Sequence, residues 1–341
     1  MKKMILALAA ALAVACTPEL PYNAPEKKEE VKDVVFAKGA DVSWLTQMES
    51  EGLSFKNAAG ETTECMTLLR DECGVNAIRL RVWVNPVEGW NNVDDVLAKA
   101  RRAAALGLSV MIDFHFSDTW ADPANQNVPA AWASHDLAGL RKDVTGHVTE
   151  MLSKLKKYGI APQWVQIGNE TRGGMMYPLG KYDNGSNFAS LVNAGYDAVK
   201  AIFPDSQVIV HLDSGNRLDL YTRIFGYLSK NSGRYDMIGM SFYPEADSWQ
   251  ASTDQLISNI SEVAKTYGKP VMICEIGMTW DEGAKCKAMI SKIMDAFGTG
   301  GETLKGIFYW EPQAPAGYNG GYAKGCFANG APTEALDPFK N

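Results

Sequence analysis

Two glutamates stand where carboxyl groups could do acid and base chemistry. Glu170 ends the apolar run "QWVQIGNE", and Glu275 lies near the end of the run "PVMICEIG". A carboxyl pair can cleave a glycosidic bond, because one member attacks the sugar carbon while the other protonates the leaving oxygen. A separation of about 5 to 5.5 Å gives retention of configuration, and about 6.5 to 9.5 Å admits a water and gives inversion. A lone glutamate at a strand end is more often an ion-pair or cap partner, so only the pair supports this hypothesis.

Other polar and aromatic residues follow the same kind of apolar run. Asn169 precedes Glu170, and its amide can hydrogen-bond a sugar 2-hydroxyl, a contact that strengthens in the transition state. The remaining residues of this set are Arg79, Arg81, Asp113, His115, Asp118, His211, Asp213, Tyr243, Trp310 and Glu311. Taken singly, either histidine could be a core residue and Trp310 a packing residue. Arg81 could simply neutralise buried acids.

The runs that carry these residues recur eight times, with helical segments between them. They span residues 38–44, 76–83, 109–116, 163–170, 207–214, 236–244, 270–277 and 305–312. Eight strand-then-helix units in one domain predict the α/β class and a single (β/α)8 TIM barrel. A doubly wound open sheet is the alternative, but no GxGxxG or P-loop follows the first run.

The strand ends of such a barrel meet at one face, which would bring the polar residues together. Glu170 is then expected to be the general acid/base, with a raised pKa. Glu275 is expected to be the nucleophile, kept ionised by donors such as Arg81 and Tyr243. Their strands favour the closer, retaining separation. The two longest connections, 117–136 and 312–338, are rich in Gly, Pro, Asn and aromatic residues and are predicted to be binding loops.

Composition excludes some partners and leaves others open. Hydrophobic residues make up 46% and charged residues 21% of the 341, and the net charge is −7 with a pI near 5.3. This balance argues against nucleic acid or an anionic membrane surface as a partner. Trp and Tyr number nine and thirteen, which suits a barrel core and equally suits sugar-stacking platforms.

The N-terminal residues are expected to direct export rather than to fold. Lys2 and Lys3 precede an apolar run over residues 4–14, which predicts a signal peptide over 1–15. The string "LAVACT" resembles a bacterial lipobox and implies cleavage before Cys16 and acylation of its thiol. An ordinary signal with an incidental cysteine is the alternative. Residues 16–35 are predicted to form a flexible tether, and 36–341 the catalytic domain.

The other cysteines predict neither an essential disulfide nor a zinc site. They are Cys65, Cys73, Cys274, Cys286 and Cys326, an odd number without CxxC spacing. Cys65 and Cys73 fall about two turns apart on one predicted helix, too far for a bridge. No metal or other cofactor is predicted.

Several longer strings resemble glycoside hydrolase family 53, the endo-β-1,4-galactanases of clan A. They are "GADVSW" at 39–44, "RLRVWVNP" at 79–86, "DFHFSDTWADPANQ" at 113–126, "VQIGNE" at 165–170, "IGMSFYP" at 238–244, "VMICEIGMTW" at 271–280 and "FYWEP" at 308–312. "DFHFSDTWADP" is the most specific of them. The Asn-Glu pair and the late glutamate are shared across clan A and would equally fit cellulases, mannanases or xylanases.

The resemblance implies internal, retaining cleavage of β-1,4-galactan, as in type I arabinogalactan. It implies Glu170 as acid/base and Glu275 as nucleophile. The residues that it implies for sugar binding are Arg81, His115, Asp118, Trp120, Asn169, His211, Tyr243 and Trp310. Ile276 stands where the family usually has Thr. The string "TWDEGAKCK" is too poor in oxygen ligands for the calcium loop of some bacterial members, so no such site is predicted.

Three hypotheses follow from the sequence. The first is a monomeric endo-galactanase held by a lipid anchor alone, on the outer membrane or cell surface of a Gram-negative bacterium. The second is another clan A polysaccharidase, which would differ only in substrate. The third is a lipid-anchored glycan-binding protein without catalysis, although a buried acid pair would cost such a binder stability for no purpose.

Overall fold

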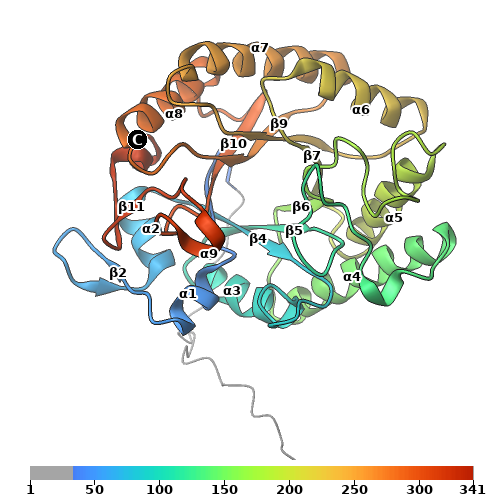
Figure 1. Cartoon of the computed structure of the whole chain (residues 1–341), viewed down its shortest axis with the longest axis horizontal. Coiled ribbons are helices and arrows are strands. Elements are labelled where there is room, and N and C mark those ends of the chain that lie inside the picture. The colour runs from blue at the N-terminus through green and yellow to red at the C-terminus, as the bar shows by residue number, and fades with distance from the viewer. Residues whose placement is uncertain (1–33, 341) are drawn as a thin grey trace, which may run out of the picture.

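The computed structural model describes residues 34–340, and their parallel strands close into one barrel (Figure 1). The predicted signal peptide, Cys16 and nearly all of the predicted tether lie outside the described residues. Within these residues the barrel strands are β1 (Ala37–Asp41), β4 (Ala77–Val82), β5 (Ser109–Phe114), β6 (Trp164–Ile167), β7 (Gln207–Leu212), β8 (Met237–Phe242), β9 (Val271–Ile276) and β10 (Leu304–Trp310). They follow one another in chain order, and β1 pairs with both β4 and β10. The predicted (β/α)8 TIM barrel is confirmed.

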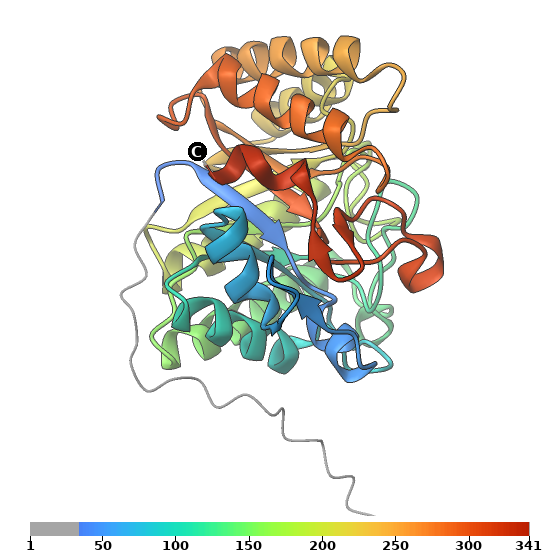
Figure 2. The same cartoon turned by 90° about the vertical axis from the view of Figure 1, so that its left-hand side faces the viewer.

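Helices surround this barrel on the outside (Figures 1 and 2). They are α2 (Cys65–Cys73), α3 (Val93–Ala105), α4 (Leu137–Lys157), α5 (Asn187–Ile202), α6 (Leu218–Lys230), α7 (Trp249–Tyr267) and α8 (Gly283–Phe297). Side-chain caps begin three of them, and at α2 the Glu64 carboxylate accepts from the Thr67 amide. Asn92 accepts from the first amides of α3, and Asp136 accepts from the Gly139 amide of α4, which satisfies groups that a helix start leaves unpaired.

Short elements fill the connections. They are α1 (Leu45–Ser50), the pairs β2 (Phe55–Lys56) with β3 (Thr62–Thr63) and β11 (Phe327–Ala328) with β12 (Ala331–Pro332), α9 (Tyr318–Gly321), and the 3₁₀ segments η1 (Ala130–Trp132) and η2 (Glu334–Lys340). Segment η2 lies against α8 and α2, so the end of the chain covers the gap between the first and last units (Figure 2). A Cβ on Gly74, at the end of α2, would lie 2.3 Å from the Phe339 carbonyl oxygen. Glycine is therefore required at this contact.

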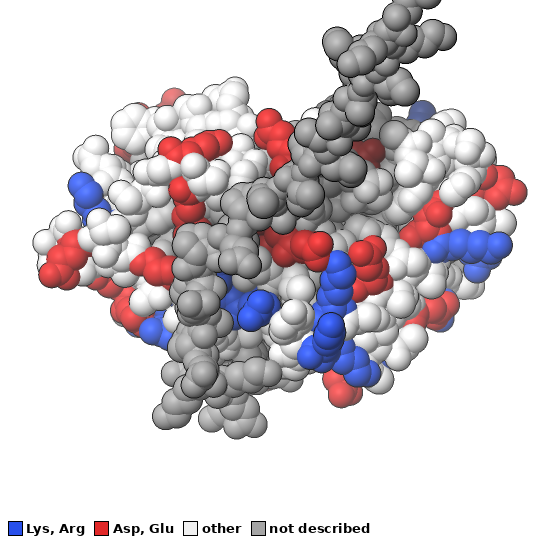
Figure 3. Space-filling model, turned by 90° about the horizontal axis from the view of Figure 1, so that it is seen from below, with Lys and Arg blue, Asp and Glu red and all other residues white. Residues whose placement is uncertain are grey.

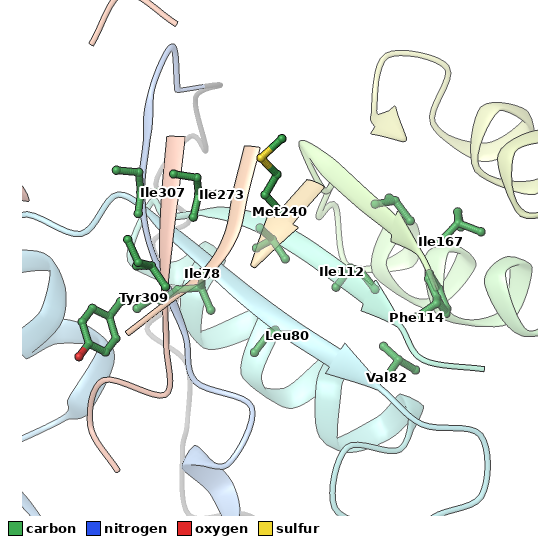
Figure 4. Packing of buried hydrophobic residues seen from close by; sticks show 14 of the residues in the cluster. Ile78, Leu80, Val82, Ile112, Phe114, Ile167, Met240, Ile273, Ile307 and Tyr309 are labelled. Atoms are coloured by element: carbon green, nitrogen blue, oxygen red, sulfur yellow. The ribbon is translucent and has the colours of Figure 1, made fainter. Parts of the chain in front are cut away.

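Strand alternation sorts the apolar side chains into two layers. Ile78, Leu80 and Val82 face the surrounding helices and form part of the main core (Figure 4). The residues between them face the barrel axis, where a separate apolar cluster fills the lower interior. Trp164 and Phe308 meet edge to face there, with ring centroids 5.8 Å apart. The lower barrel is thus a packed core, which leaves the mouth at the strand ends for chemistry.

The described residues also show the state of the cysteines and the distribution of surface charge. In the described part of the chain the five cysteines are free and buried. Over the same residues, no helix has the length and apolar character needed to cross a membrane. On the face seen in Figure 3, acidic and basic side chains are interspersed rather than gathered into a patch of one sign.

One buried histidine of α4 makes stability depend on pH. His147 packs against Phe114, Phe116 and Trp132, and burial lowers its pKa to about 4. Below its ordinary pKa near 6.5 the unfolded chain binds a proton here that the folded chain does not, so the free energy of unfolding falls as pH drops from 6.5 to 4. His147→Phe should remove on the order of 2 to 3 kcal/mol of this fall.

Urea unfolding at pH 7 and pH 4.5 measures this effect. The exposed His135, which pairs with Asp143, provides the control variant His135→Phe. The prediction would be contradicted if the free energy of unfolding fell by the same amount between pH 7 and pH 4.5 in His147→Phe as in the parent protein.

Candidate active site

A cleft opens at the mouth of the barrel, where the strand ends and their loops converge. It has a volume of about 340 Å³, within the lower range of small-molecule sites. Its lining residues are His115, Trp120, Ala121, Asp122, Asn169, Glu170, Tyr243, Glu275, Trp310, Tyr322 and Lys324. The cleft therefore combines acids, hydrogen-bonding groups and flat aromatic rings.

The two glutamates face each other in this cleft. A carboxyl oxygen of Glu170, one of Glu275 and a ring nitrogen of His211 all lie within 4.8 Å of one another. This spacing falls on the side of the closer, retaining geometry rather than the wider, inverting one. These three residues also offer three ligand atoms that could meet around one cation, so a bound cation would compete with a sugar for both carboxyls.

The backbone turns sharply to present Glu170. Strand β6 ends at Ile167, Gly168 has φ +83°, and Glu170 itself has φ +47°, a left-handed conformation that is uncommon outside glycine. The amide of the next residue, Thr171, donates to the His211 carbonyl oxygen at 2.9 Å and holds the turn against β7. Such local strain is typical of functional positions.

A bulge in β9 presents Glu275. Against β8, Met240 pairs with Ile273 but Ser241 pairs with Glu275. Against β10, Ile307 pairs with Ile273 while Tyr309 pairs with Ile276. Strand β9 therefore contains one extra residue relative to both neighbours, and a bulge of this kind re-aims the side chains that follow it. Strict alternation from Ile273, a residue of the outer core, would have turned Glu275 away from the barrel axis.

Arg79 is the cation that holds Glu275. Its guanidinium lies 3.0 Å from Glu275, 2.8 Å from Asp41 and 2.8 Å from Asp113. It also donates to the side-chain oxygens of Gln166 and Asn169. The prediction that Arg81 holds Glu275 is wrong. Both arginines face the barrel interior, but Arg81 lies nearer the rim and pairs with Glu311 at 3.2 Å.

The donors around each carboxyl distinguish the two acids. Burial raises the pKa of Glu275 to about 7, while the charge of Arg79 and the Tyr243 hydroxyl, 2.8 Å away, act to lower it. Burial and the nearby charge of Glu275 raise the pKa of Glu170 well above its ordinary value. The Ser241 hydroxyl, a neutral donor at 2.6 Å, and the charge of Arg79 oppose this rise. Glu275 should therefore ionise first, and Glu170 should keep its proton.

The two histidines of the site are neutral and hydrogen-bonded. His115 accepts on Nδ1 from the Trp83 indole and the Ala121 amide, so its Nε2–H donates to Asp113. Burial lowers the pKa of His115 and, more strongly, that of His211. His211 lies between Gln166 and Ser241. Because the Ser241 hydroxyl donates to Glu170, we infer that His211 Nε2–H donates to Ser241 and fixes its orientation.

One wall of the cleft is a cluster of aromatic rings. Buried Trp44 lies at its centre, with Trp120, Trp310 and Tyr322 at centroid distances of 5.6, 5.1 and 5.4 Å. Arg81 stacks behind this wall, 4.4 Å from the Trp120 ring centroid. The predicted Trp120 and Trp310 thus line the cleft, whereas Arg81 supports the wall from behind.

Asp118 is not among the cleft-lining residues. Its two carboxyl oxygens accept hydrogen bonds from the backbone amides of Asn85 and Ala130, so it braces two loops. Of the other predicted binding residues, five line the cleft, namely His115, Trp120, Asn169, Tyr243 and Trp310. Arg81 lies behind the aromatic wall, and His211 contacts Ser241, whose hydroxyl donates to Glu170. The structure adds lining residues that the sequence reasoning did not single out, namely Ala121, Asp122, Tyr322 and Lys324. Tyr322 and Lys324 belong to the predicted binding loop 312–338.

An acid pair at this spacing, beside flat aromatic rings at the mouth of a (β/α)8 barrel, defines a glycoside hydrolase. The chain belongs to glycosyl hydrolase family 53, whose model matches residues 37–291. It is 34% identical over 297 residues to the arabinogalactan endo-β-1,4-galactanase of Thermothelomyces thermophilus, covering 81% of this chain and 89% of the relative. It is 33% identical over 316 residues to the endo-β-1,4-galactanase of Bacillus subtilis, covering 84% and 72%.

Solved structures agree with this assignment. A structure from a study of two fungal β-1,4-galactanases superposes with a TM-score of 0.82 at 30% identity, covering 90% of this chain and 99% of that one. The family 53 catalytic domain of Ignisphaera aggregans superposes with a TM-score of 0.80 at 27% identity, covering 93% and 99%. The match extends over the barrel and its loops.

Removing one donor from each acid should move opposite limbs of the pH profile of kcat/KM. Tyr243→Phe removes a donor to ionised Glu275, which raises the pKa of Glu275 and moves the acidic limb up. Ser241→Ala removes the donor to Glu170, which raises the pKa of Glu170 and moves the alkaline limb up. A hydrogen bond of about 1 kcal/mol corresponds to a shift of roughly 0.7 pH unit.

The pH dependence of sugar release by each variant, compared with the parent protein, measures these shifts. The assignment of acid and nucleophile would be reversed if Tyr243→Phe moved the alkaline limb and Ser241→Ala the acidic one.

Proposed function

We propose that this protein hydrolyses β-1,4-linked galactan, including type I arabinogalactan, at internal bonds and with retention of configuration. The observation that carries the proposal is the pair Glu170 and Glu275, with carboxyl oxygens within 4.8 Å, in a chain of family 53. The names of the relatives, which are galactanases from a fungus and a bacterium, support galactan as the substrate.

The geometry supports a double displacement. In the first step the Glu275 carboxylate attacks the anomeric carbon, the glycosidic bond breaks, and Glu170 gives its proton to the departing oxygen. In the second step Glu170, now ionised, takes a proton from water. That water attacks the same carbon and releases Glu275 as a carboxylate. The starting protonation states are restored, so each turnover consumes one water.

The surrounding residues have separable roles in this scheme. Arg79 and Tyr243 stabilise the ionised nucleophile. Asn169, whose amide group is fixed by Arg79 and the Ala121 carbonyl, is placed to bind the 2-hydroxyl of the sugar under attack. Trp310 and Trp120 offer ring faces for sugars in the cleft, and His115 and His211 hold the network behind the acids.

Replacing either acid should abolish hydrolysis without unfolding the barrel. Glu275→Gln and Glu170→Gln should each lower kcat on β-1,4-galactan by at least about 10³-fold, because the nucleophile or the proton donor is lost. Glu302→Gln is the matched control, since Glu302 is exposed and precedes β10 at the opposite end of the barrel. Reducing-sugar release and product sizing on galactan, mannan, xylan and β-glucan measure activity and substrate together.

Three outcomes would contradict the proposal. Full activity in Glu275→Gln would remove its mechanism. A parent protein that cleaved one of the other polysaccharides and not galactan would reassign the substrate within the clan. A protein that bound galactan without releasing any fragment would be the binding protein considered above.

We also propose that the mature protein is an exported lipoprotein, anchored at the outer membrane or cell surface through Cys16, with one chain as the working unit. The string "LAVACT" after a basic and apolar leader supports the anchor, and a cleft built by one chain supports the monomer. The parent protein should partition into detergent after expression in a two-membrane bacterium, and Cys16→Ser should partition into buffer. Detergent partition of the Cys16→Ser protein would contradict acylation at this residue.

A further inference from the structure

Trp280 is a large aromatic residue that the fold leaves uncovered. Its side chain is 46% exposed. It lies in the loop that follows β9, the strand that carries Glu275. Among the described residues it makes no ring contact with another aromatic residue or a cation. Among residues 34–340 the other exposed aromatic residue is Tyr158, which ends α4 and packs under Arg101. A single exposed indole is ordinary on a protein surface, but it offers a flat apolar face to a ligand that reaches it.

The loop that carries Trp280 is fastened to the rim of the cleft. Its amide donates to the Ala323 carbonyl oxygen at 2.9 Å, and Ala323 lies between Tyr322 and Lys324, which both line the cleft. Closer to the acids, a Cβ on Gly277 would lie 3.2 Å from the Tyr243 ring and 3.4 Å from the Lys324 carbonyl oxygen. The backbone of Trp280 is therefore joined to the segment 322–324, which forms part of the cleft wall, and the exposed indole extends from this junction.

Lys324, which lines the cleft next to the residue that Trp280 contacts, supplies a cation. Its ammonium lies 5.8 Å from the centre of the Tyr243 ring, and no carboxylate among the described residues forms a salt bridge with it. An ammonium group in this position has donors available for hydroxyl groups of a bound chain. An aromatic face and a nearby donor are the two elements that sugar rings require.

We propose that Trp280 forms an outer binding subsite, which stacks against a galactose unit of the same chain that is cleaved at the acid pair. This inference rests on the proposed function and extends its site. In galactose the axial 4-hydroxyl leaves the hydrogens of C3, C4 and C5 on one face of the ring. That apolar face can cover the exposed indole, while Lys324 donates to hydroxyl groups on the inner side. The subsite selects for chain length, because only a long chain reaches both the acids and Trp280.

The test measures affinity against chain length in an inactive protein. In the Glu275→Gln background, β-1,4-galacto-oligosaccharides of two to six units are titrated calorimetrically into the parent, Trp280→Ala and Trp280→Phe. Losing the stacked ring should weaken the longest ligand by about tenfold, as expected for one aromatic contact. The disaccharide should change by less than about twofold, and Trp280→Phe should retain part of the affinity.

Tyr158→Ala is the matched control, because it also deletes an exposed aromatic side chain but at the end of the barrel opposite the cleft. Unchanged affinity of Trp280→Ala for every length would overturn the inference while leaving the proposed function intact. An equal loss at every length would also overturn it, because the residue would then act on the whole cleft. A parent that bound none of these oligosaccharides would overturn the proposed function and, with it, this subsite.

Discussion

The site depends on one buried cation that three carboxylates share. Arg79 contacts Asp41, Asp113 and Glu275 inside the barrel, where its side chain is 1% exposed. Removing Arg79 would leave these buried carboxylates without their cation, which is far more costly than losing a surface ion pair. The strands β1, β4, β5 and β9 must therefore keep their register, because each contributes one member. This constraint also positions Asn169, which shares a donor of the same guanidinium.

The unequal sharing of this cation explains why two chemically identical side chains can take different roles. Glu275 has a cation and a phenol as donors, while among the described residues Glu170 has the Ser241 hydroxyl alone. Burial penalises both charges, so the carboxyl with stronger donors ionises and the other remains an acid. Burial would also raise the pKa of Asp113, but Arg79 and His115 lower it. At the barrel mouth, the hydrogen-bond donors and cations around each carboxyl group thus determine which of these groups are ionised.

A second buried arginine supports binding rather than chemistry. Arg81 stands two residues after Arg79 on β4 and faces the same interior, yet it contacts Glu311 and the rings of Trp44, Trp83 and Trp120. Its Nε and Nη2 have no hydrogen-bond partner among the described residues, so the aromatic faces are its principal environment. The difference between these two arginines is one of depth in the barrel, and residue type gives no indication of it.

The sequence by itself determined the barrel, because eight apolar runs alternating with helical segments leave few other ways to bury both faces of a sheet. It also determined which strand ends carry acids, aromatic rings and the Asn169–Glu170 pair. Tertiary structure alone decided which arginine holds Glu275, that Asp118 braces loops, and that Tyr322 and Lys324 reach the cleft from residues far along the chain. It also placed the bulge that turns Glu275 inward. The physical reason is that side-chain direction at the mouth depends on register between neighbouring strands, and register is set by contacts distant in sequence.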